Sequence, residues 1–417
     1  MYKQKVDIVV IGGGISGITT AIEAAETGYK VILIEKLPYL GGRIVKMYRY
    51  FPKLCPPTCG LEINYKRIKA NPNISVFTSA EVDKISGQKG AFELVVKRQP
   101  KYVNDNCTAC GECEKVCPES RKDEFNYNLA STKAVYMPHS MAYPWQYTID
   151  GNACKKENCN KCVEICKYQA IDLKAAEETI QVEAASVVVA TGWKPYGASR
   201  INNLKYALYD DVISNVEMER TLAPDGPTNG DVLRFSDNKK VNSIAFVQCA
   251  GSRDEKHQAW CSGVCCSASL KQALAFAEKN KDAEVSIFYI DIRVSGRNED
   301  FLEKVKSQGK IELVKGKVGD IEYNKESEKY IVHAENIEAG KKMNKEFDMV
   351  VLAAGIGAEP LDIIGESTDQ YGFISEEKLQ EGIFAAGCCK KPMDVSSSLK
   401  DATGKALKAI QVVRNAN

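Results

Sequence analysis

One stretch near the N-terminus restricts the possible folds more than any other, namely IVVIGGGISGITTAIEAAETGYKVILIEK over 8–36. A mostly apolar run over 6–11 predicts a buried parallel strand, and a G-x-G-x-x-G loop follows it. Ser16 to Gly28 predicts a helix, and Val31 to Glu35 predicts a second strand that ends in an acid. This order of strand, loop, helix, strand and acid predicts a dinucleotide-binding unit.

The glycines of this loop have separate physical roles. Gly12 makes the tight turn, Gly14 lets the backbone approach a pyrophosphate, and Gly17 lets the helix and strand pack closely. The pyrophosphate would bind free N–H groups at the helix N-terminus, beside Ser16. Glu35 is placed to accept hydrogen bonds from a ribose. A merely structural glycine-rich turn explains the loop alone but not the whole combination.

The residues directly after the acid favour FAD over NAD. Lys36 is followed by a second glycine pair, which ends in Gly42 and precedes Arg43. This feature resembles the flavoproteins that have two dinucleotide-binding domains, where the loop wraps the flavin side of FAD. The resemblance implies an α/β fold of the thioredoxin-reductase and glutathione-reductase type.

Composition restricts the class of protein further. A chain of 417 residues can form two or three domains. The net charge of +1 gives no electrostatic reason to expect binding to nucleic acid or to an anionic membrane. We find no apolar run near the roughly 20 residues that span a bilayer, and no signal peptide. We therefore expect a cytoplasmic protein that reaches the membrane only through partner subunits.

Sixteen cysteines are many for such a chain, and their tight grouping favours metal or redox sites over disulfides. The first run, which begins at Cys107, is C-x2-C-x2-C-x3-C-P without deviation. That run is typical of ferredoxins, in which three thiolates hold one [4Fe–4S] cluster and the fourth reaches the other cluster. The motif is highly specific for such clusters, and a zinc site or a purely structural role is the alternative that it disfavours.

The second run has a longer first spacing, and Lys167 stands where the first run has proline. A pseudo-twofold arrangement would cross the two runs, so that each supplies one ligand to the cluster of the other. One predicted set is therefore Cys107, Cys110, Cys113 and Cys166, and the other is Cys117, Cys154, Cys159 and Cys162. Both lie in a ferredoxin-like module that is inserted into the flavin fold.

Residues 240–288 predict a second dinucleotide domain, with a strand at 244–247 and a helix at 269–279. Its loop reads QCAGSRD in place of G-x-G-x-x-G, so we expect no nicotinamide cofactor there. The domain instead carries four cysteines, and from the residues alone a further [4Fe–4S] cluster, a redox disulfide and buried thiols all remain open. These four are Cys249, Cys261, Cys265 and Cys266.

The C-terminal part is expected to complete the flavin site. A turn at Thr191 and Gly192 resembles the crossover fingerprint of such flavoproteins. Gly387 ends the last flavin strand, but Cys388 and Cys389 follow it where these proteins place an aspartate that binds the ribityl chain. A helix predicted over 398–412 would direct its N-terminal dipole at the flavin. The remaining FAD-binding candidates are Val82, Val395 and Ser396.

The predicted domain organisation follows from these segments. A proline-containing stretch, 50–60, is expected to be a loop near the flavin, where Cys55 and Cys59 could be cluster ligands, a redox pair or packing residues. The predicted ranges are 1–100 and 176–200 for the FAD domain, 101–175 for the module, 201–355 for the second domain, and 356–417 for the last FAD part.

Taken together, these motifs resemble the A component of heterodisulfide reductase and its relatives over nearly the whole chain. The motifs are the FAD fingerprint, FPKLCPPTCG, CTACGECEKVCP, FVQCAGSRD with WCSGVCC, FYIDIR and IFAAGCCKKPMDV. In that family the cysteines of the second domain match a non-ferredoxin cluster motif, so the resemblance favours a third [4Fe–4S] cluster there.

Full-length heterodisulfide reductase A chains carry terminal extensions that are not found here, and the shorter form resembles the A component of the quinone-interacting membrane-bound oxidoreductase (Qmo) complex. This resemblance implies a related B component, a haem-containing membrane C component, and adenylylsulfate reductase as the acceptor in sulfate reduction.

Three other functions remain open: a soluble component with electron bifurcation at the flavin, an NAD(P)H-dependent flavoenzyme, and a scaffold without cofactors. We expect no acid–base catalytic residues, because His139, His257 and His333 form no pattern.

Overall fold

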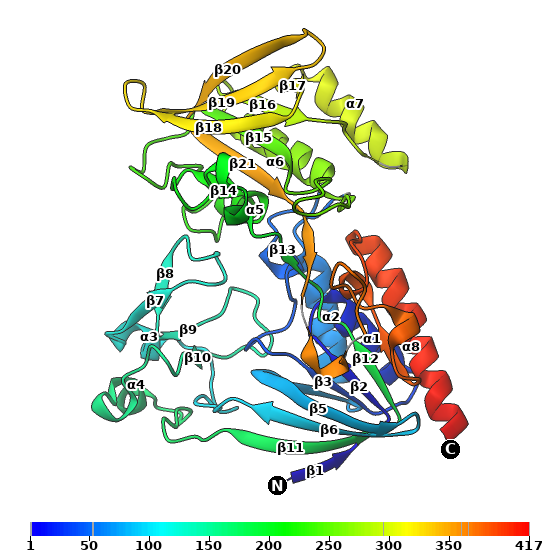
Figure 1. The fold of residues 1–417 in the computed structure, drawn as a ribbon. Coiled ribbons are helices and arrows are strands. Elements are labelled where there is room, and N and C mark those ends of the chain that lie inside the picture. Colours follow the sequence, from blue (N-terminus) through cyan, green and yellow to red (C-terminus); the bar gives the residue numbers. More distant parts are fainter. Residues whose placement is uncertain (1, 52–53, 295, 360, 366, 417) are drawn as a thin grey trace.

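A computed structural model describes the chain with six short gaps, and Pro52 and Lys53 of the FPKLCPPTCG motif lie outside the described residues. Figure 1 shows two α/β units, one above the other, with a smaller unit of short strands and helices beside the lower one. The described residues are 2–51, 54–294, 296–359, 361–365 and 367–416.

The lower unit, which we call the FAD domain, contains a five-stranded parallel sheet in the order β23-β12-β2-β3-β4. Every residue of the three middle strands is buried, as expected where both faces of a parallel sheet are covered. The strands are β2 (Ile8–Ile11), β3 (Val31–Ile34), β4 (Ile74–Phe77), β12 (Ser186–Val189) and β23 (Ile383–Ala385).

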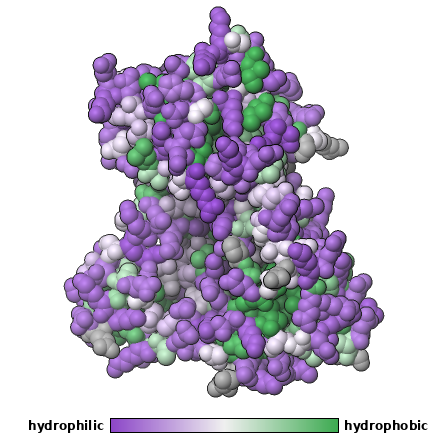
Figure 2. Space-filling view, in the orientation of Figure 1, coloured by the Kyte–Doolittle hydropathy of each residue, from purple (hydrophilic) through white to green (hydrophobic). Residues whose placement is uncertain are grey.

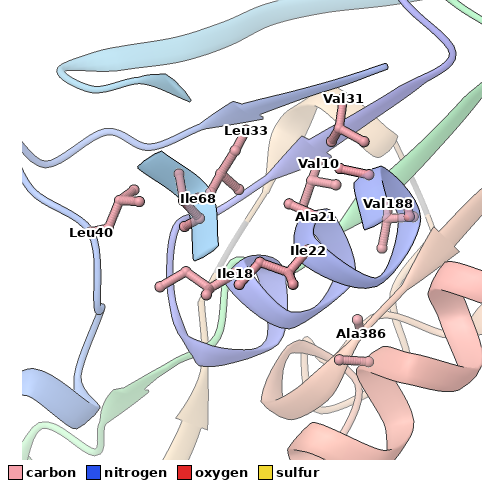
Figure 3. Packing of buried hydrophobic residues seen from close by; sticks show 14 of the residues in the cluster. Val10, Ile18, Ala21, Ile22, Val31, Leu33, Leu40, Ile68, Val188 and Ala386 are labelled. Carbon is pink, nitrogen blue, oxygen red and sulfur yellow. The ribbon is translucent and has the colours of Figure 1, made fainter. Parts of the chain in front are cut away.

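Helices cover one face of this sheet, and a second sheet covers the other face. Figure 3 shows Ala21 of one helix next to Val10 and Val188 of the sheet, and Ile18 of the same helix belongs to the same buried cluster. The helices are α1 (Ile15–Glu26), α2 (Thr58–Ala70) and α8 (Val395–Ala416). The covering sheet has the order β1-β11-β6-β5, with β1 (Tyr2–Lys5), β5 (Ala80–Gln88), β6 (Ala91–Arg98) and β11 (Glu178–Ala184).

The upper unit, the second domain, repeats this three-layer plan. Its parallel sheet has the order β14-β21-β15-β16-β17, with β14 (Val212–Ser214), β15 (Ser243–Ala250), β16 (Glu284–Tyr289), β17 (Glu312–Lys315) and β21 (Met349–Ala354). One face packs on helices, which are α5 (Asn215–Leu222), α6 (Cys265–Lys279) and α7 (Glu299–Ser307). The other packs on an antiparallel sheet of β18 (Val318–Asn324), β19 (Lys329–Asn336) and β20 (Lys341–Phe347).

A short ribbon connects the two domains, and a further unit interrupts the FAD domain. The ribbon pairs β13 (Trp193–Pro195) with β22 (Ile356–Ala358). The further unit, the insert, lies between the neighbouring strands β6 and β11, so the covering sheet stays intact around it. The insert contains β7 (Ser120–Lys122), β8 (Ser131–Lys133), β9 (Val135–Tyr136), β10 (Thr148–Ile149), α3 (Glu112–Val116) and α4 (Lys161–Ile165).

Some element boundaries differ from the sequence-based expectation. The stretch 50–60 was expected to be a loop throughout, but α2 begins at Thr58 because proline is tolerated directly before and at the start of a helix. Helix α8 begins at Val395, earlier than the predicted 398, because the Asp394 carboxylate accepts the Ser397 N–H at 2.6 Å.

The insert contacts both domains at one buried junction. Arg220 of α5 is only 1% exposed, and its Nε donates to Asn126 Oδ1 of the insert at 2.8 Å. Its guanidinium lies 4.5 Å from the Phe125 ring centroid, and His139 stacks on that ring at 4.9 Å. Lys46 of the FAD domain donates to Glu124 O at 2.8 Å. Side chains from all three units therefore meet here.

The surface has the hydrophilic character expected of a chain in which 27% of the residues are charged. Figure 2 shows hydrophilic residues over most of the visible face. Among the described residues, none of the helices combines the length and apolar character that crossing a bilayer requires.

Candidate cofactor sites

The glycine loop after β2 is tightly packed on one side and open on the other. Gly12 has a φ of +108°, which favours glycine, and a Cβ there would overlap the Ala190 carbonyl. A Cβ on Gly17 would overlap the carbonyl oxygen of Gly12. At Gly14, by contrast, an added Cβ would meet only Gly42 Cα, 3.9 Å away. The open side therefore leaves room for a group to approach the backbone at Gly14.

Helix α1 starts at this loop without a side-chain cap. Gly14 is the N-cap and supplies no capping side chain, and no acidic residue lies in the first turn. Ser16 is buried beneath Gly387, where a Cβ would overlap the serine hydroxyl. The positive end of the helix dipole thus remains available to an anion such as a pyrophosphate.

Glu35 is held beside the loop by the backbone. Its Oε2 accepts the Gly13 N–H at 2.6 Å, and its Oε1 accepts the Leu37 N–H at 2.8 Å. Burial raises the pKa of this carboxyl, and the backbone N–H bonds oppose that effect. A carboxylate oxygen can accept more than one hydrogen bond, so both oxygens retain capacity for ribose hydroxyls.

The other predicted FAD residues lie around this loop in different ways. Arg43 donates from Nε to Trp193 O, and its guanidinium lies 5.1 Å from the Trp193 ring centroid. The Thr191 hydroxyl is buried and has no hydrogen-bond partner among the described residues, so it is available to a ligand. Lys36 pairs with Glu359 at 3.8 Å on the surface, and Val82 is buried in β5.

The turn after β23 shows one residue that the sequence did not reveal. The Asp401 carboxylate, from within α8, accepts the Gly387 N–H at 2.8 Å. Cys388 is buried there and donates from Sγ to Met393 O at 3.4 Å, and burial raises the pKa of its thiol. Val395 is half-buried and Ser396 is exposed at the start of α8. Only the pairing of the helix with the turn identifies Asp401.

The first predicted cysteine set surrounds a single hollow in the insert. This hollow has a volume of about 340 Å³, including its part open to solvent. Burial raises the pKa of the Cys113 thiol to about 12, and the neighbouring thiols act in the same direction. The cysteines that line the hollow are Cys107, Cys110, Cys113 and Cys166, so the structure brings a residue of the second run to three of the first.

The second set is arranged around Cys162. Burial raises the pKa of the Cys162 thiol to about 11, and Cys154, Cys117 and Cys159 lie close enough to raise it further. Helices α3 and α4, which carry the two runs, pack against each other. Each loop also contains an equivalent hydrogen bond. The Ala109 N–H donates to Cys107 Sγ in the first, and the Lys156 N–H donates to Cys154 Sγ in the second, both at 3.4 Å. The two halves of the insert therefore have corresponding local geometry.

The third set lies at the carboxyl end of β15 and the start of α6. Burial raises the pKa of the Cys265 thiol to about 12, with Cys266, Cys249 and Cys261 nearby. The Gly263 N–H donates to Cys261 Sγ at 3.4 Å, which repeats the contact seen in the insert.

The loop that carries this third set is attached to the interdomain ribbon. Trp260 Nε1 donates to Ile356 O at 3.1 Å, and Ser262 Oγ accepts the Ile356 N–H at 2.7 Å. Because Ile356 belongs to β22, the third set lies against the connection that leads through β13 to Thr191 and Gly192 of the FAD domain.

The spacing and the protonation of the cysteine thiols both bear on what these sites can bind. Among the residues that the structure describes, no three His, Cys, Asp or Glu side chains form a site for a single metal ion. In a [4Fe–4S] cluster each cysteine sulfur binds a different iron atom from outside, so the four sulfurs lie farther apart than the ligands of one ion. Thiols with raised pKa values stay protonated unless a metal centre stabilises the thiolates.

Of the remaining cysteine pair, Cys55 lies in the segment between β3 and α2, and Cys59 lies in the first turn of α2. The Tyr50 N–H donates to Cys55 O at 3.1 Å, and Cys55 is half-buried while Cys59 is exposed.

Comparison with known proteins adds to this geometry. Residues 7–72 match the family model "FAD dependent oxidoreductase", which supports FAD as the dinucleotide. The first of two iron–sulfur A components of CoB–CoM heterodisulfide reductase in Methanopyrus kandleri is 35% identical over 96% of this chain and 63% of its own length. The A component of a ferredoxin:CoB–CoM heterodisulfide reductase of Methanosarcina acetivorans is 34% identical over 97% of this chain and 57% of its own.

This chain is a homologue of the A component of heterodisulfide reductase. It spans about three fifths of the length of these relatives. The thioredoxin reductase of Lactococcus lactis covers 98% of the chain and 99% of its own, with a TM-score of 0.52 at 14% identity. The bacillithiol disulfide reductase of Bacillus cereus covers 99% and 100%, with a TM-score of 0.51 at 12% identity. The predicted two-dinucleotide-domain flavoprotein fold is therefore confirmed.

Proposed function

We propose that this chain is an electron-transfer component of a multi-subunit oxidoreductase and that it binds FAD and three [4Fe–4S] clusters. One observation carries the proposal: a cysteine set occupies the position in the second domain where a nicotinamide cofactor would bind. A chain built in this way exchanges electrons through clusters rather than with NAD(P)H. FAD supplies coupling between two-electron and one-electron steps, and the clusters supply one-electron transfer.

In this proposal each cysteine set holds one cluster. The donor chemistry fits, because each set offers four sulfurs and cysteine thiolate is the usual ligand of such clusters. The backbone N–H groups that donate to Cys107, Cys154 and Cys261 would stabilise the added charge of a reduced cluster. Binding would release the protons of the ligating thiols.

The FAD site is proposed to use the residues around the glycine loop. Gly12, Gly14, Ser16 and Gly17 would bind the pyrophosphate, and Glu35 would orient the ribose. The start of α8 would direct its dipole at the flavin. Asp401 would fix the turn at Gly387 that closes over α1.

A direct test counts the cofactors. The chain purified without oxygen should contain one FAD and the iron and sulfide of three clusters. Dithionite should bleach the flavin and the clusters, whereas NADH alone should not. Rapid bleaching by NADH would contradict the proposal and favour a self-contained NAD(P)H-dependent flavoenzyme. A protein that binds neither FAD nor iron after reconstitution would favour a scaffold.

For the partners we propose the quinone-linked arrangement. A related B component, together with a haem-containing membrane C component, would hold the chain at the cytoplasmic side of the membrane. Electrons would pass from the quinone pool towards adenylylsulfate reductase in sulfate reduction. The resemblance of the sequence to the A component of the Qmo complex supports this arrangement.

The alternative is a soluble complex in which the flavin bifurcates electrons between ferredoxin and a disulfide. The name of the Methanosarcina relative, which includes both ferredoxin and a heterodisulfide, favours this second candidate. Affinity purification from native membranes in mild detergent separates the two. A co-purified haem-bearing membrane protein would support the quinone-linked complex, and only soluble proteins of the heterodisulfide-reductase type would contradict it.

A further inference from the structure

Gln248 is a buried amide without partners beside the third cysteine set. It lies near the end of β15, directly before Cys249, and is 6% exposed. Neither Nε2 nor Oε1 has a hydrogen-bond partner among the described residues. Such groups cost free energy when buried, so an unpartnered amide indicates a missing neighbour.

The other buried glutamines of this domain differ from Gln248. Gln258 donates from Nε2 to Ile356 O at 3.2 Å, and its Oε1 accepts the Ser252 hydroxyl at 3.4 Å. Gln272 donates to Asn215 O at 2.8 Å and to Glu219 Oε1 at 2.7 Å. Each of these two side chains therefore has a structural role, whereas no contact within the described chain explains Gln248.

The strand geometry indicates where this amide lies. Ile244 and Phe246 alternate onto the face of the sheet that packs against α6, in the same core as Cys266. Alternation places Gln248 on that face as well, at the carboxyl end where α6 begins. The amide is thus on the side of the sheet where the third set is assembled.

A bulge brings the next residue to the same place. Val247 pairs with Leu352 and Ala250 pairs with Ala354, so two residues of β15 face one residue of β21. Cys249 has a φ of +56°, which turns the backbone within this bulge. In a regular strand the side chains of consecutive residues point to opposite faces. The bulge redirects the Cys249 side chain, so Cys249 lies near Cys265 although the preceding Gln248 is on the same face. Strand and bulge together place ligand and amide side by side.

We propose that Gln248 Nε2 donates a hydrogen bond to a sulfur of the third cluster and thereby raises its reduction potential. Reduction adds negative charge to the cluster, and a hydrogen-bond donor stabilises that charge. This inference rests on the proposed function, because it requires a cluster at Cys249, Cys261, Cys265 and Cys266. Gln248 acts as a positioning residue through the cluster and is not a ligand.

The test is an EPR-monitored redox titration of the whole chain purified without oxygen. Gln248→Met keeps the approximate size of the side chain and removes the donor. We expect the equilibrium constant for reduction of the third cluster to fall about tenfold, which is about 59 mV for one electron. The potentials of FAD and of the insert clusters should not change.

Ser269→Ala is the matched control. Ser269 is also fully buried without a partner for its hydroxyl among the described residues, and it lies one turn along α6. Its replacement changes the polarity of the same core but removes no donor proposed for the cluster. Equal shifts in both variants, or no shift in Gln248→Met, would overturn the inference.

Two further variants keep the result decisive. Gln248→Glu provides a second test if the methionine variant does not fold, because an added carboxylate should lower the potential further. Cys265→Ser separates this inference from the proposed function. If its iron content equals that of the parent, there is no third cluster and both fail. If the iron falls but Gln248 variants leave the potential unchanged, only the inference about Gln248 fails.

Discussion

The FAD domain and the second domain place a loop at the same structural position and use it differently. Strands β2 and β15 are each the middle strand of a five-stranded parallel sheet, and each leads into a helix. After β2 three glycines connect directly to α1, whereas after β15 the longer stretch 251–264 precedes α6. The first loop leads into a helix N-terminus without a side-chain cap, and the second carries thiols.

This difference shows how one scaffold can serve two chemistries. The carboxyl end of a central parallel strand is a natural binding position, because loops and helix N-termini converge there. Glycines at this position let a phosphate approach the backbone, and cysteines provide soft ligands for iron. The scaffold decides where a group binds, and the loop residues decide which group it is.

The largest effect should come from the glycine loop. In Gly17→Ala the added Cβ would overlap the Gly12 carbonyl, so we expect loss of FAD and destabilisation by about 3 kcal/mol. Thermal denaturation and the FAD content per chain measure both effects.

Gly14→Ala is the informative control. Its Cβ would meet only Gly42 Cα at 3.9 Å, so the melting temperature of the FAD-free protein should stay near that of the parent while FAD binding is lost. Full FAD occupancy in Gly14→Ala would mean that no pyrophosphate approaches this backbone, and the contrast between the two loops would fail.

A substitution in the third cysteine set should affect iron and leave FAD in place, the opposite of the glycine-loop variants. Cys265→Ser should remove the iron of one cluster and leave FAD bound, since the two sites lie in different domains. Iron analysis and the flavin absorbance decide this. Cys389→Ser is the control, because burial also raises the pKa of that thiol to about 12 but it lies outside all three sets. Unchanged iron in Cys265→Ser would show that this loop only buries its thiols.

The insert differs from both loops, because each of its two cysteine runs is predicted to supply one ligand to the cluster held mainly by the other run. If the runs cross, Cys107→Ser and Cys166→Ser damage one cluster, so the double variant should lose no more iron than either single variant. Cys107→Ser with Cys117→Ser should lose the iron of both clusters. Additive iron loss in the first pair would show that each run holds its own cluster, as the single loop of the second domain does.

The smallest effect concerns the junction that joins the two domains through the insert. Burial lowers the pKa of His139 to about 4 from 6.5, although Asp225 opposes the shift. The folded protein therefore disfavours protonation of His139. This has no effect on the free energy of unfolding above pH 6.5, and it lowers that free energy as the pH falls towards 4, by about 2 kcal/mol at pH 5. His139→Phe keeps the ring stacked on Phe125 and should reduce the loss of stability between pH 7 and 5. Parallel pH profiles in denaturant titrations would contradict this role.

Much of the architecture could be predicted from short-range patterns. The glycine loop with Glu35 predicted the α/β flavoprotein fold. Gly12 allows a backbone conformation with positive φ, and Gly17 allows close packing of the helix on the loop, so both requirements can be recognised from the sequence. Helix α2 was missed at Thr58, since Pro56 and Pro57 suggested a loop and only the packing of Leu61 and Ile68 in the core shows the helix.

Residue type and spacing alone predict the kind of chemistry at each loop, because they decide whether a backbone or a thiol is offered to a ligand. The meeting of distant residues, by contrast, became visible in the folded chain. Cys166 reaches the first run, Asp401 reaches Gly387, and Gln248 remains without a partner among the described residues beside Cys249. These outcomes depend on contacts between segments far apart in the chain, and such contacts leave no periodic pattern in a single sequence.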